Sequence, residues 1–210
     1  EPFCGGCNSL DKVQNPRIGC DSNKYLIALL REMQKQVPFN PPHIGEAEYK
    51  AIQQNKENYP DWLVGYVGFN LSFAAKFFGG YRRDKAGIRN YENEAQQNLL
   101  AQQNLLAQQN LLAGIDFYCS DYRLLDIPKN SIIYCDPPYK NTTQYKDKFD
   151  HFAFYAWCRK MKRSGHTVFV SEYTMPNDFT CVWEKEVSSN LDVSSKGKKE
   201  TEKLFELKEA

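Results

Sequence analysis

The chain has 210 residues, which is enough for one or two domains with a buried core. Its 27 lysines and arginines nearly balance its 26 aspartates and glutamates, so the formal net charge is only +1. This balance excludes a global positive field, and a polyanionic partner would have to bind a local basic patch. No apolar stretch approaches the length of a membrane span, and no segment resembles a signal peptide.

The seven cysteines are an odd number, and most of them stand in apolar runs. This usage favours reduced thiols and a cytoplasmic setting. Cys4 and Cys7 have the CxxC spacing of many metal and redox sites. No second pair and no nearby histidine complete such a site, so we expect no bound metal.

The first residues, 1–4, predict the end of a strand that runs into a glycine-rich turn at Gly5 and Gly6. Adjacent glycines let a ligand approach the backbone closely and leave N–H groups facing it. A turn of this kind is common, so it indicates a binding site only together with other features.

The next predicted elements are a short strand that ends at Asp21 and a helix from Lys24 to about Gln36. An acid at the end of the second strand of an α/β unit is placed to accept hydrogen bonds from ribose hydroxyls. The alternative interpretation is that Asp21 or Ser22 is simply the N-cap of the helix.

The segment 38–90 differs in character, because four prolines break its first half and aromatic residues crowd its second half. Residues 66–75 predict a buried helix. A glycine-hinged loop follows, with the mixture of aromatic and basic side chains that meets phosphates and stacked bases: Tyr81, Arg82, Arg83 and Lys85. The alternative is a solvated basic loop. We expect this segment to be an insert that reads DNA.

Residues 95–112 are three tandem copies of Ala-Gln-Gln-Asn-Leu-Leu, and they predict a helix. Six residues advance a helix by about 600°, so successive leucine pairs are turned by roughly 120° and cannot share one buried face. The repeat indicates a local expansion of one helix and suggests no chemistry.

Residues 115–119 predict another short strand, which is followed by Asp121 and Tyr122. An acid beside an aromatic ring at a strand end suits the amine and the ring of an adenine. The alternative is an ordinary turn.

The most informative stretch is the apolar run Ile132–Cys135, a predicted buried strand, followed by Asp136, Pro137, Pro138 and Tyr139. The prolines fix an extended turn, so Asp136 stands at the carboxyl end of a strand, where open α/β sheets bind ligands. The Asp136 carboxylate and the Pro137 carbonyl accept two amine hydrogens, and Tyr139 supplies a flat face. This set suits a planar base with an exocyclic amine.

The remaining elements are predicted from alternation and periodicity. They are a polar lid loop over 140–150, a helix over 152–163, a strand over 167–173, and closing strands over 181–187 and 203–207. The segment 188–199 between the closing strands is expected to be an exposed hairpin loop, in which Lys198 is a further candidate for DNA contact.

Taken together, these motifs resemble the Dam-type (class D12) DNA N6-adenine methyltransferases, particularly small phage-encoded members. The matching segments occur in the order of that family: residues 1–6, Gly68–Asn70 with Phe77–Tyr81, Tyr118–Tyr122, Asp136–Tyr139 and Val170–Tyr173. The resemblance implies an α/β class I (Rossmann-like) methyltransferase fold with a mostly parallel sheet, one antiparallel hairpin strand and an inserted helical target-recognition segment. The core would comprise residues 1–37 and 91–210.

The resemblance also implies that S-adenosylmethionine is the methyl donor and that double-stranded DNA is the substrate. In this interpretation the donor's methionine portion lies against Phe3, Cys4, Gly5 and Gly6. Asp21 meets its ribose, Asp121 and Tyr122 meet its adenine, and the catalytic segment Asp136–Tyr139 holds a flipped target adenine, with Asp136 also near the donor.

Two departures from the family pattern keep other functions open. Cys7 stands where the family has a third glycine or alanine, and the family's Gly-Gly-Lys segment would lie upstream of Glu1. The alternatives are a weakened remnant that binds DNA or regulates, and methylation of cytosine N4 or of glutamine. Enzymes of the last two kinds more often carry Ser or Asn in place of Asp136.

Overall fold

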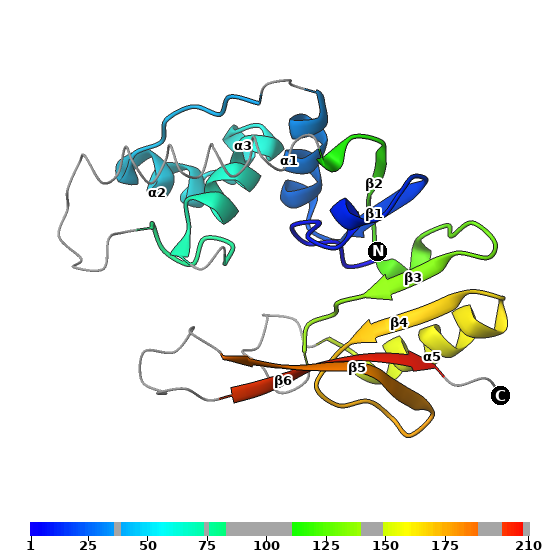
Figure 1. The fold of residues 1–210 in the computed structure, drawn as a ribbon. Helices are drawn as coiled ribbons and strands as arrows, with labels where there is room; N and C mark the ends of the chain where they lie inside the picture. Colours follow the sequence, from blue (N-terminus) through cyan, green and yellow to red (C-terminus); the bar gives the residue numbers. More distant parts are fainter. Residues whose placement is uncertain (36–38, 74–75, 83–110, 140–148, 189–198, 208–210) are drawn as a thin grey trace. The chain divides into compact units, whose positions relative to one another are not determined.

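The computed structural model describes residues 1–35, 39–73, 76–82, 111–139, 149–188 and 199–207 (Figure 1). The chain separates into two compact units. One comprises Glu1–Cys4 with Asp121–Ala210, and the other comprises Gly5–Ser120.

The unit Gly5–Ser120 contains a parallel pair of strands, β1 (Arg17–Asp21) and β2 (Ile115–Cys119), with Arg17 opposite Ile115 and Asp21 opposite Cys119. Helix α1 (Lys24–Lys35) follows β1 and contacts β2. One face of this amphipathic helix is buried: Leu26, Ile27, Leu29, Leu30 and Met33. The strand–helix–strand order and the parallel pairing make this part an α/β unit.

The same unit carries two further α-helices, α2 (Glu46–Gln54) and α3 (Asp61–Gly65), and α3 continues into a π-helical turn, η3 (Tyr66–Asn70). Short 3-10 turns occur at η1 (Leu10–Lys12) and η2 (Lys56–Asn58). Helix α3 packs so closely on α1 that a Cβ at Gly65 would lie 2.2 Å from the carbonyl oxygen of Tyr25. Only glycine permits this approach.

The second unit contains a four-stranded sheet in the order β3-β4-β6-β5. The strands are β3 (Ile132–Cys135), β4 (Thr167–Ser171), β5 (Phe179–Ser188) and β6 (Lys199–Leu207). Strands β3 and β4 are parallel, whereas β6 inserts between β4 and β5 and is antiparallel to both. Because β3 and β4 are parallel neighbours, their carboxyl ends lie side by side at the same end of the sheet.

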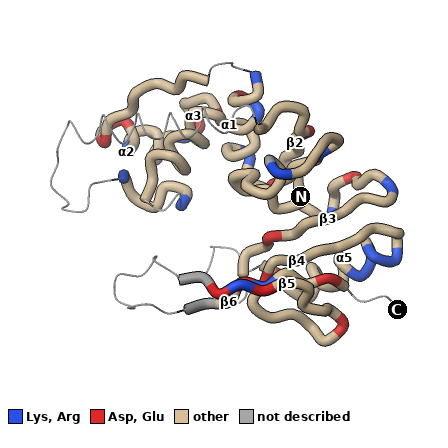
Figure 2. The backbone as a smooth tube through the Cα atoms, viewed as in Figure 1, with Lys and Arg blue, Asp and Glu red and all other residues tan. Residues whose placement is uncertain are grey.

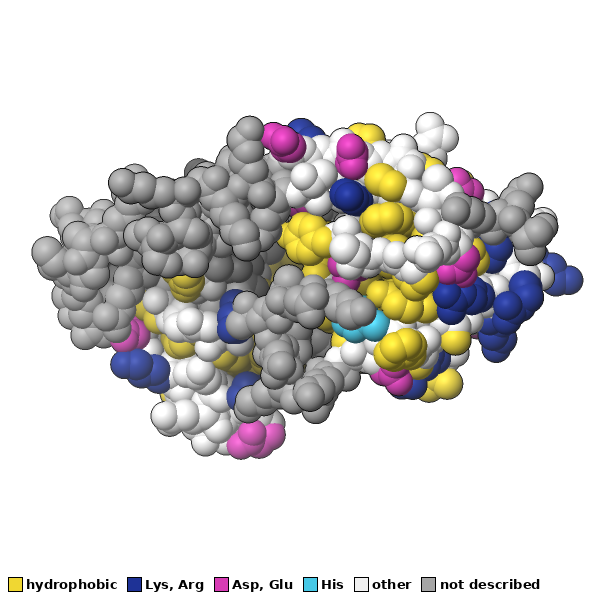
Figure 3. Space-filling view, turned by 90° about the horizontal axis from the view of Figure 1, so that it is seen from below, with side chains coloured by type: hydrophobic (Ala, Val, Ile, Leu, Met, Phe, Trp, Pro, Cys, Tyr) yellow, Lys and Arg dark blue, Asp and Glu magenta, His cyan; other side chains and the backbone are white. Residues whose placement is uncertain are grey.

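Asp150 is the N-cap of helix α5 (His151–Arg163), and its side chain accepts a 3.0 Å hydrogen bond from the N–H of Ala153. Its buried residues form a core with the sheet: Phe154, Tyr155, Trp157 and Cys158 against Val168, Val170, Phe205 and Leu207. Lys160, Lys162 and Arg163 occupy the last turn, where they complement the helix dipole. Figure 2 marks Lys and Arg positions in blue near this end of α5, and Figure 3 shows Lys and Arg side chains gathered on the right of the face seen there.

The structure confirms most of the expected elements, with shifted ends. Residues 1–4 form turns and not the end of a strand. Helix α2 was not expected, and β6 begins before residue 203. Of the repeat over 95–112, only Leu111 and Leu112 are among the described residues. Leu112 is fully buried, and its carbonyl accepts a hydrogen bond from Gln34.

The expected division into a core and an insert over 38–90 stays a prediction. Helices α2 and α3 belong to the same compact unit as β1, α1 and β2. No helix among the described residues has the length and apolar character needed to cross a bilayer.

Candidate functional site

The glycine turn and Asp21, the acid that ends β1, lie together in the unit Gly5–Ser120. The N–H of Gly5 points at Asp21 Oδ2 at 3.4 Å, and Gly5 has a left-handed φ of 45°. A Cβ built on Gly5 would meet no described atom within 4 Å, so the space beside this glycine is open. An accessible backbone next to a carboxylate fits the hydroxyl and amino groups of a nucleoside ligand.

The alternative role of Asp21 or Ser22 as a helix cap is wrong, because Asn23 performs it. The side chain of Asn23 accepts hydrogen bonds from the N–H groups of Tyr25 and Leu26 at 3.0 and 3.2 Å. Asp21 accepts the N–H of Asn23 at 2.8 Å through Oδ1. Burial raises the pKa of the Asp21 carboxyl, against the opposite effect of backbone hydrogen bonds from Asn23, Gly5 and Ser22.

Cys7 continues the glycine turn with a backbone that L-residues rarely adopt. Its φ is 60°, in the left-handed region, and its side chain is fully buried. Glycine would fit this backbone freely, whereas cysteine strains it.

In the other unit, Phe3 and Tyr122 belong to an aromatic cluster. Their ring centroids are 5.0 Å apart, and both rings also contact Phe149 and Phe154. Tyr122 is only 8% exposed, and desolvation raises its pKa to about 12. Phe3 is half-buried and Cys4 is buried. The aromatic cluster therefore encloses most of the Tyr122 side chain, and its expected role beside the donor's adenine stays a prediction.

Asp121 is paired with its neighbour Arg123. Its Oδ1 accepts from the Nε of Arg123 at 2.8 Å and its Oδ2 accepts from Nη2 at 2.6 Å, while the Arg123 N–H also bonds Oδ1. The hydrogen bond from the Arg123 side chain lowers the pKa of the Asp121 carboxyl. A carboxylate has about four lone-pair sites, so an adenine amine would share this acid with Arg123.

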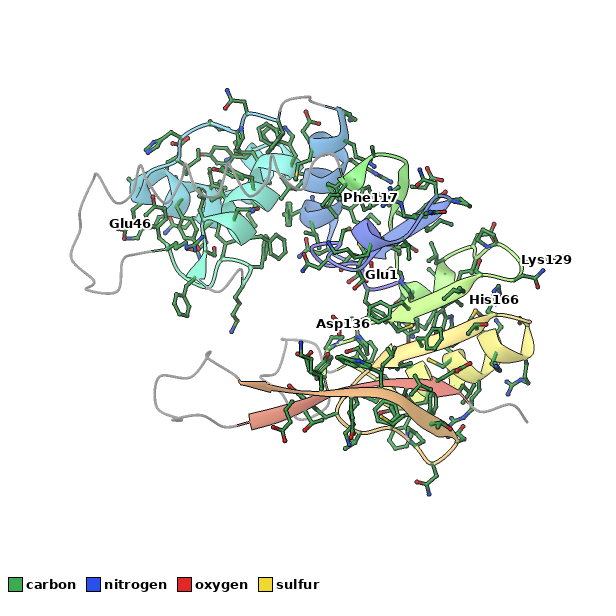
Figure 4. The ribbon with its side chains drawn as sticks, in the orientation of Figure 1. Glu1, Glu46, Phe117, Lys129, Asp136 and His166 are labelled. Atoms are coloured by element: carbon green, nitrogen blue, oxygen red, sulfur yellow. The ribbon has the colours of Figure 1, made fainter. Side chains whose placement is uncertain are left out.

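Asp136 follows β3 and forms a three-residue cluster with Tyr139 and Ser171 (Figure 4 labels Asp136). The Tyr139 and Ser171 hydroxyl oxygens are 2.5 Å apart, and both side chains hydrogen-bond the Asp136 carboxylate. Ser171 ends β4, the parallel neighbour of β3. The cluster therefore joins two adjacent strand ends, at the edge where open sheets bind ligands.

Opposing influences act on the pKa of the Asp136 carboxyl. Partial burial of the carboxylate raises its pKa above the ordinary 3.8, although the residue as a whole is exposed. The negative charges of Glu202 and Glu172 add to this rise, whereas the hydrogen bonds from Tyr139 and Ser171 oppose it. Burial also raises the pKa of the Tyr139 phenol, so this hydroxyl stays a donor.

Two further residues contact the loop after β3. The Tyr173 ring packs edge-on against Tyr139 with centroids 4.9 Å apart. The Nε2 of His151 lies 3.2 Å from the carbonyl oxygen of Pro138 and 3.7 Å from Glu172 Oε1. In the sequence, Val170–Tyr173 stands out only as a matching motif without a role for each residue, and no sequence signal marks His151.

The candidate DNA-contacting residues are described only in part, since Arg83, Lys85 and Lys198 lie outside the described residues. Tyr81 pairs with Ser72 in an antiparallel bridge, and Phe73 N–H donates to Gly80 at 2.9 Å, so residues 71–82 include a small hairpin. The Tyr81 hydroxyl donates to the carbonyl of Ile44 at 3.1 Å, which anchors this side chain.

Side chains other than Tyr81 are exposed on this hairpin. Phe73 is 65% exposed, and Lys76 and Arg82 are also exposed. An apolar ring beside two cations matches the chemistry of nucleic-acid contact better than the anchored Tyr81 does. Exposure of Phe73 was not foreseen, because its apolar neighbours in sequence suggested a buried helix.

Among the described residues, no group of three or more His, Cys, Asp or Glu side chains could hold a metal ion. All seven cysteines, which are all described, are free thiols, and five of them are buried.

The family of D12 class N6 adenine-specific DNA methyltransferases matches residues 45–191 of the chain. This match covers well over half of the 210 residues and includes Asp136–Tyr139. A search of curated proteins found no significant match. The resemblance seen in the motifs and the expected α/β class I (Rossmann-like) fold are both confirmed. The chain belongs to the D12 class of N6 adenine-specific DNA methyltransferases.

Proposed function

We propose that this protein moves a methyl group from S-adenosylmethionine to N6 of a flipped adenine in double-stranded DNA. The observation that carries the proposal is the position of Asp136 at the carboxyl end of β3, where Tyr139 and Ser171 hydrogen-bond its carboxylate. An acid fixed in this way needs no reorganisation when positive charge develops on an adjacent nitrogen.

Asp136 and Pro137 act on the amine of the target base. In a free adenine, the N6 lone pair is delocalised into the ring. Hydrogen bonds from the amine to the Asp136 carboxylate and to the Pro137 carbonyl favour a pyramidal nitrogen with a localised lone pair. As the new N–C bond forms, positive charge grows on nitrogen, and the Asp136 carboxylate stabilises it.

Tyr139 holds the base itself. Its half-buried ring is fixed at the hydroxyl end by Ser171 and on one side by Tyr173. A base inside a duplex cannot reach this ring, so the target adenine has to leave the stack. Stacking on Tyr139 contributes about 1–3 kcal/mol, on the scale of base–aromatic contacts, and offsets part of the cost of flipping.

The residues expected at the donor fit an adenosyl sulfonium compound. The space beside Gly5 is open, and the Asp21 carboxylate lies next to it. In the other unit, the Asp121 carboxylate can accept a hydrogen bond from an amine. When bound, the donor supplies a methyl group on a positively charged sulfur, which is a strong electrophile. The protein's contribution is therefore alignment and charge placement more than acid–base chemistry. The other residues of the proposed binding set are Phe3, Cys4, Gly6, Tyr122 and Asp136.

DNA contact is proposed for the hairpin that carries Arg82, and for Arg83, Lys85 and Lys198 outside the described residues. Tyr81 would support this hairpin through its bond to Ile44, and Phe73 adds an exposed ring. Cations that meet phosphates position the duplex without reading its sequence.

The test is incubation of the protein with labelled S-adenosylmethionine and random-sequence duplex DNA, followed by mass analysis of the nucleosides. We expect N6-methyladenine, and we expect Asp136→Ala to lower the rate by roughly a hundredfold or more. N4-methylcytosine as the product, or an Asp136→Ala protein as fast as the wild type, would overturn the assignment. Calorimetry with S-adenosylhomocysteine separates an enzyme from a remnant, since a remnant would release no heat of binding.

A further inference from the structure

Three consecutive residues at the end of β4 contact the loop that carries the proposed catalytic residues. Ser171 lies 2.5 Å from the Tyr139 hydroxyl oxygen, and the ring of Tyr173 packs against the ring of Tyr139. Glu172, between them, reaches the same loop through His151. Since the proposed function uses Tyr139 but neither Glu172 nor His151, this indirect contact requires its own explanation.

Glu172 is a buried acid with one hydrogen-bonded oxygen and one oxygen that faces His151. Only 1% of the residue is exposed, and its Oε2 accepts the N–H of Tyr173 at 2.6 Å. Its Oε1 lies 3.7 Å from the Nε2 of His151. A carboxylate that is removed from water needs such partners, because an unpaired one is strongly disfavoured.

Both ring nitrogens of His151 face carbonyl oxygens. Its Nε2 lies 3.2 Å from the carbonyl oxygen of Pro138, and its Nδ1 lies 3.1 Å from the carbonyl oxygen of Phe149. A carbonyl oxygen only accepts and a neutral imidazole carries one N–H, so in the tautomer with its hydrogen on Nε2 the ring donates to Pro138. The negative charge of Glu172, 3.7 Å from Nε2, favours that tautomer.

The position of the Pro138 carbonyl matters because it shares a rigid peptide plane with the N–H of Tyr139. The six atoms of a peptide unit are coplanar, so fixing the carbonyl of Pro138 also fixes the direction in which Tyr139 leaves it. Pro138 itself has no N–H with which to anchor the loop. The bond from His151 therefore orients the Tyr139 ring, whose hydroxyl in turn contacts Ser171 and Asp136.

We propose that His151, oriented by Glu172, is a positioning residue for methyl transfer: it holds the Pro138–Tyr139 peptide so that the Tyr139 ring and the Asp136 carboxylate keep the geometry that transfer needs. The inference rests on the proposed function, in which Tyr139 stacks on the base and Asp136 binds its amine. It adds that His151 and Glu172, which do not touch the base, affect the rate of methyl transfer.

The chain supplies a control in His166, which belongs to the same unit and is buried, whereas His151 is half-buried. Its Nδ1 accepts a 3.2 Å hydrogen bond from the N–H of Ser131, the residue before β3. Figure 4 shows His166 and Asp136 at opposite ends of β3. Loss of His166 removes a buried histidine of comparable size without acting on the Pro138 carbonyl.

The experiment compares the wild type with His151→Ala, His151→Gln and His166→Ala in steady-state methylation of duplex DNA, with thermal unfolding of each variant as the measure of folding. We expect His151→Ala to lower kcat roughly 10-fold to 100-fold, the scale of a small misplacement of reacting groups, with KM for the donor within about twofold. His151→Gln places an amide N–H near the Nε2 position and should recover a large part of kcat. His166→Ala should keep the wild-type kcat.

A second measurement tests the part played by Glu172. Glu172→Gln should lower kcat in the wild-type background and should cause no further loss in the His151→Ala background, because the two side chains act as one unit. Independent, multiplying losses would overturn the role of Glu172.

The outcomes separate the inference from the function on which it rests. A His151→Ala protein with the wild-type kcat, or a His151→Gln protein as slow as His151→Ala, would overturn the positioning role while leaving the methyl transfer intact. Equal losses of kcat in His151→Ala and His166→Ala would show a general folding effect and would also overturn it. A wild-type protein that methylates no DNA would overturn the proposed function itself.

Discussion

The hydroxyl oxygen of Tyr139 lies 2.5 Å from Ser171 Oγ, so the last residue of β4 is tied directly to the loop that follows β3. The two strands are parallel neighbours, with Cys135 opposite Val170. Because Asp136 is hydrogen-bonded by the same two hydroxyl groups, the acid and the ring form one hydrogen-bonded unit. A rigid acid and a rigid ring are what alignment of a base requires.

Removal of the Tyr139 hydroxyl should slow methylation moderately. Tyr139→Phe keeps the ring for stacking but loses the bonds to Ser171 and Asp136. One such hydrogen bond is worth about 1 kcal/mol, so we expect kcat to fall roughly fivefold. Steady-state methylation measures this effect, and Tyr59→Phe, in the other unit, is the control. A Tyr139→Phe protein with unchanged kcat would show that stacking alone holds the ring.

Replacement of Asp136, the proposed catalytic carboxylate, should stabilise the fold near neutral pH. Burial, together with Glu202 and Glu172, raises the pKa of Asp136, so its charged form is disfavoured in the folded protein. Below the ordinary carboxyl value of 3.8, Asp136 is neutral in both the folded and the unfolded states and costs nothing. As pH rises from that value through the raised pKa, ionisation of the partly buried Asp136 lowers the free energy of unfolding.

We therefore expect Asp136→Asn to unfold at a higher temperature than the wild type at pH 7, with the difference shrinking as pH falls towards 4. The amide oxygen of asparagine can still accept from Tyr139 and Ser171, which makes the comparison one of charge. Thermal unfolding across this pH range measures it. A variant that is less stable than the wild type at pH 7 would contradict the prediction.

The charge of Glu202 should set where activity is lost in acid. Its negative charge is one cause of the raised pKa of Asp136, and transfer requires the ionised carboxylate. Glu202→Gln should lower that pKa, so the acid limb of the kcat/KM profile should move to lower pH. Glu206→Gln, four residues along β6, is the control and should leave the limb in place. Coincident profiles for Glu202→Gln and the wild type would exclude the effect.

Much of the fold could be predicted because its strands are short apolar runs that end in polar residues. The run Ile132–Cys135 ends at an acid and two prolines, and the structure places β3 at those four residues. Helix α2 was missed because the prolines around it suggested a broken segment, whereas Gly45 starts a helix between them. Strand β6 is longer than its apolar alternation, since pairing with β5 extends it over charged residues.

The site could be predicted where one residue type carries the chemistry and not where partners are distant in sequence. Asp136 and Tyr139 stand out as an acid and a ring beside prolines. His151 lies 13 residues after Pro138, and no periodicity links the two. The burial of Tyr122 against the rings of Phe3 and Phe154 could not be predicted either, because tertiary packing is not visible in a strand-end motif.

Arg82 should contribute to DNA affinity through the phosphate backbone. It is exposed on the hairpin that Tyr81 anchors to Ile44. Arg82→Ala should weaken binding about uniformly across DNA sequences and reduce the slope of log affinity against log salt by about 1. Binding titrations at several salt concentrations measure this, with Arg163→Ala at the end of α5 as the control. An unchanged slope for Arg82→Ala would place the DNA elsewhere.

At position 7, a glycine variant should be more stable than an alanine variant, which reverses the usual order. Its φ of 60° is left-handed, which costs an L-residue roughly 1–2 kcal/mol and costs glycine nothing. Both Cys7→Ala and Cys7→Gly remove the buried thiol, so their difference isolates the backbone. The larger conformational freedom of glycine in the unfolded chain offsets about 0.4–1 kcal/mol of the gain.

We therefore expect Cys7→Gly to be more stable than Cys7→Ala by up to about 1 kcal/mol in urea unfolding. The matched control is Cys20, which is equally buried but lies in the extended backbone of β1. There the order should be the ordinary one, with Cys20→Gly less stable than Cys20→Ala by roughly 0.5–1 kcal/mol. The same order at both positions would show that the turn relaxes around residue 7, and that a cysteine there does not strain the glycine turn beside Asp21.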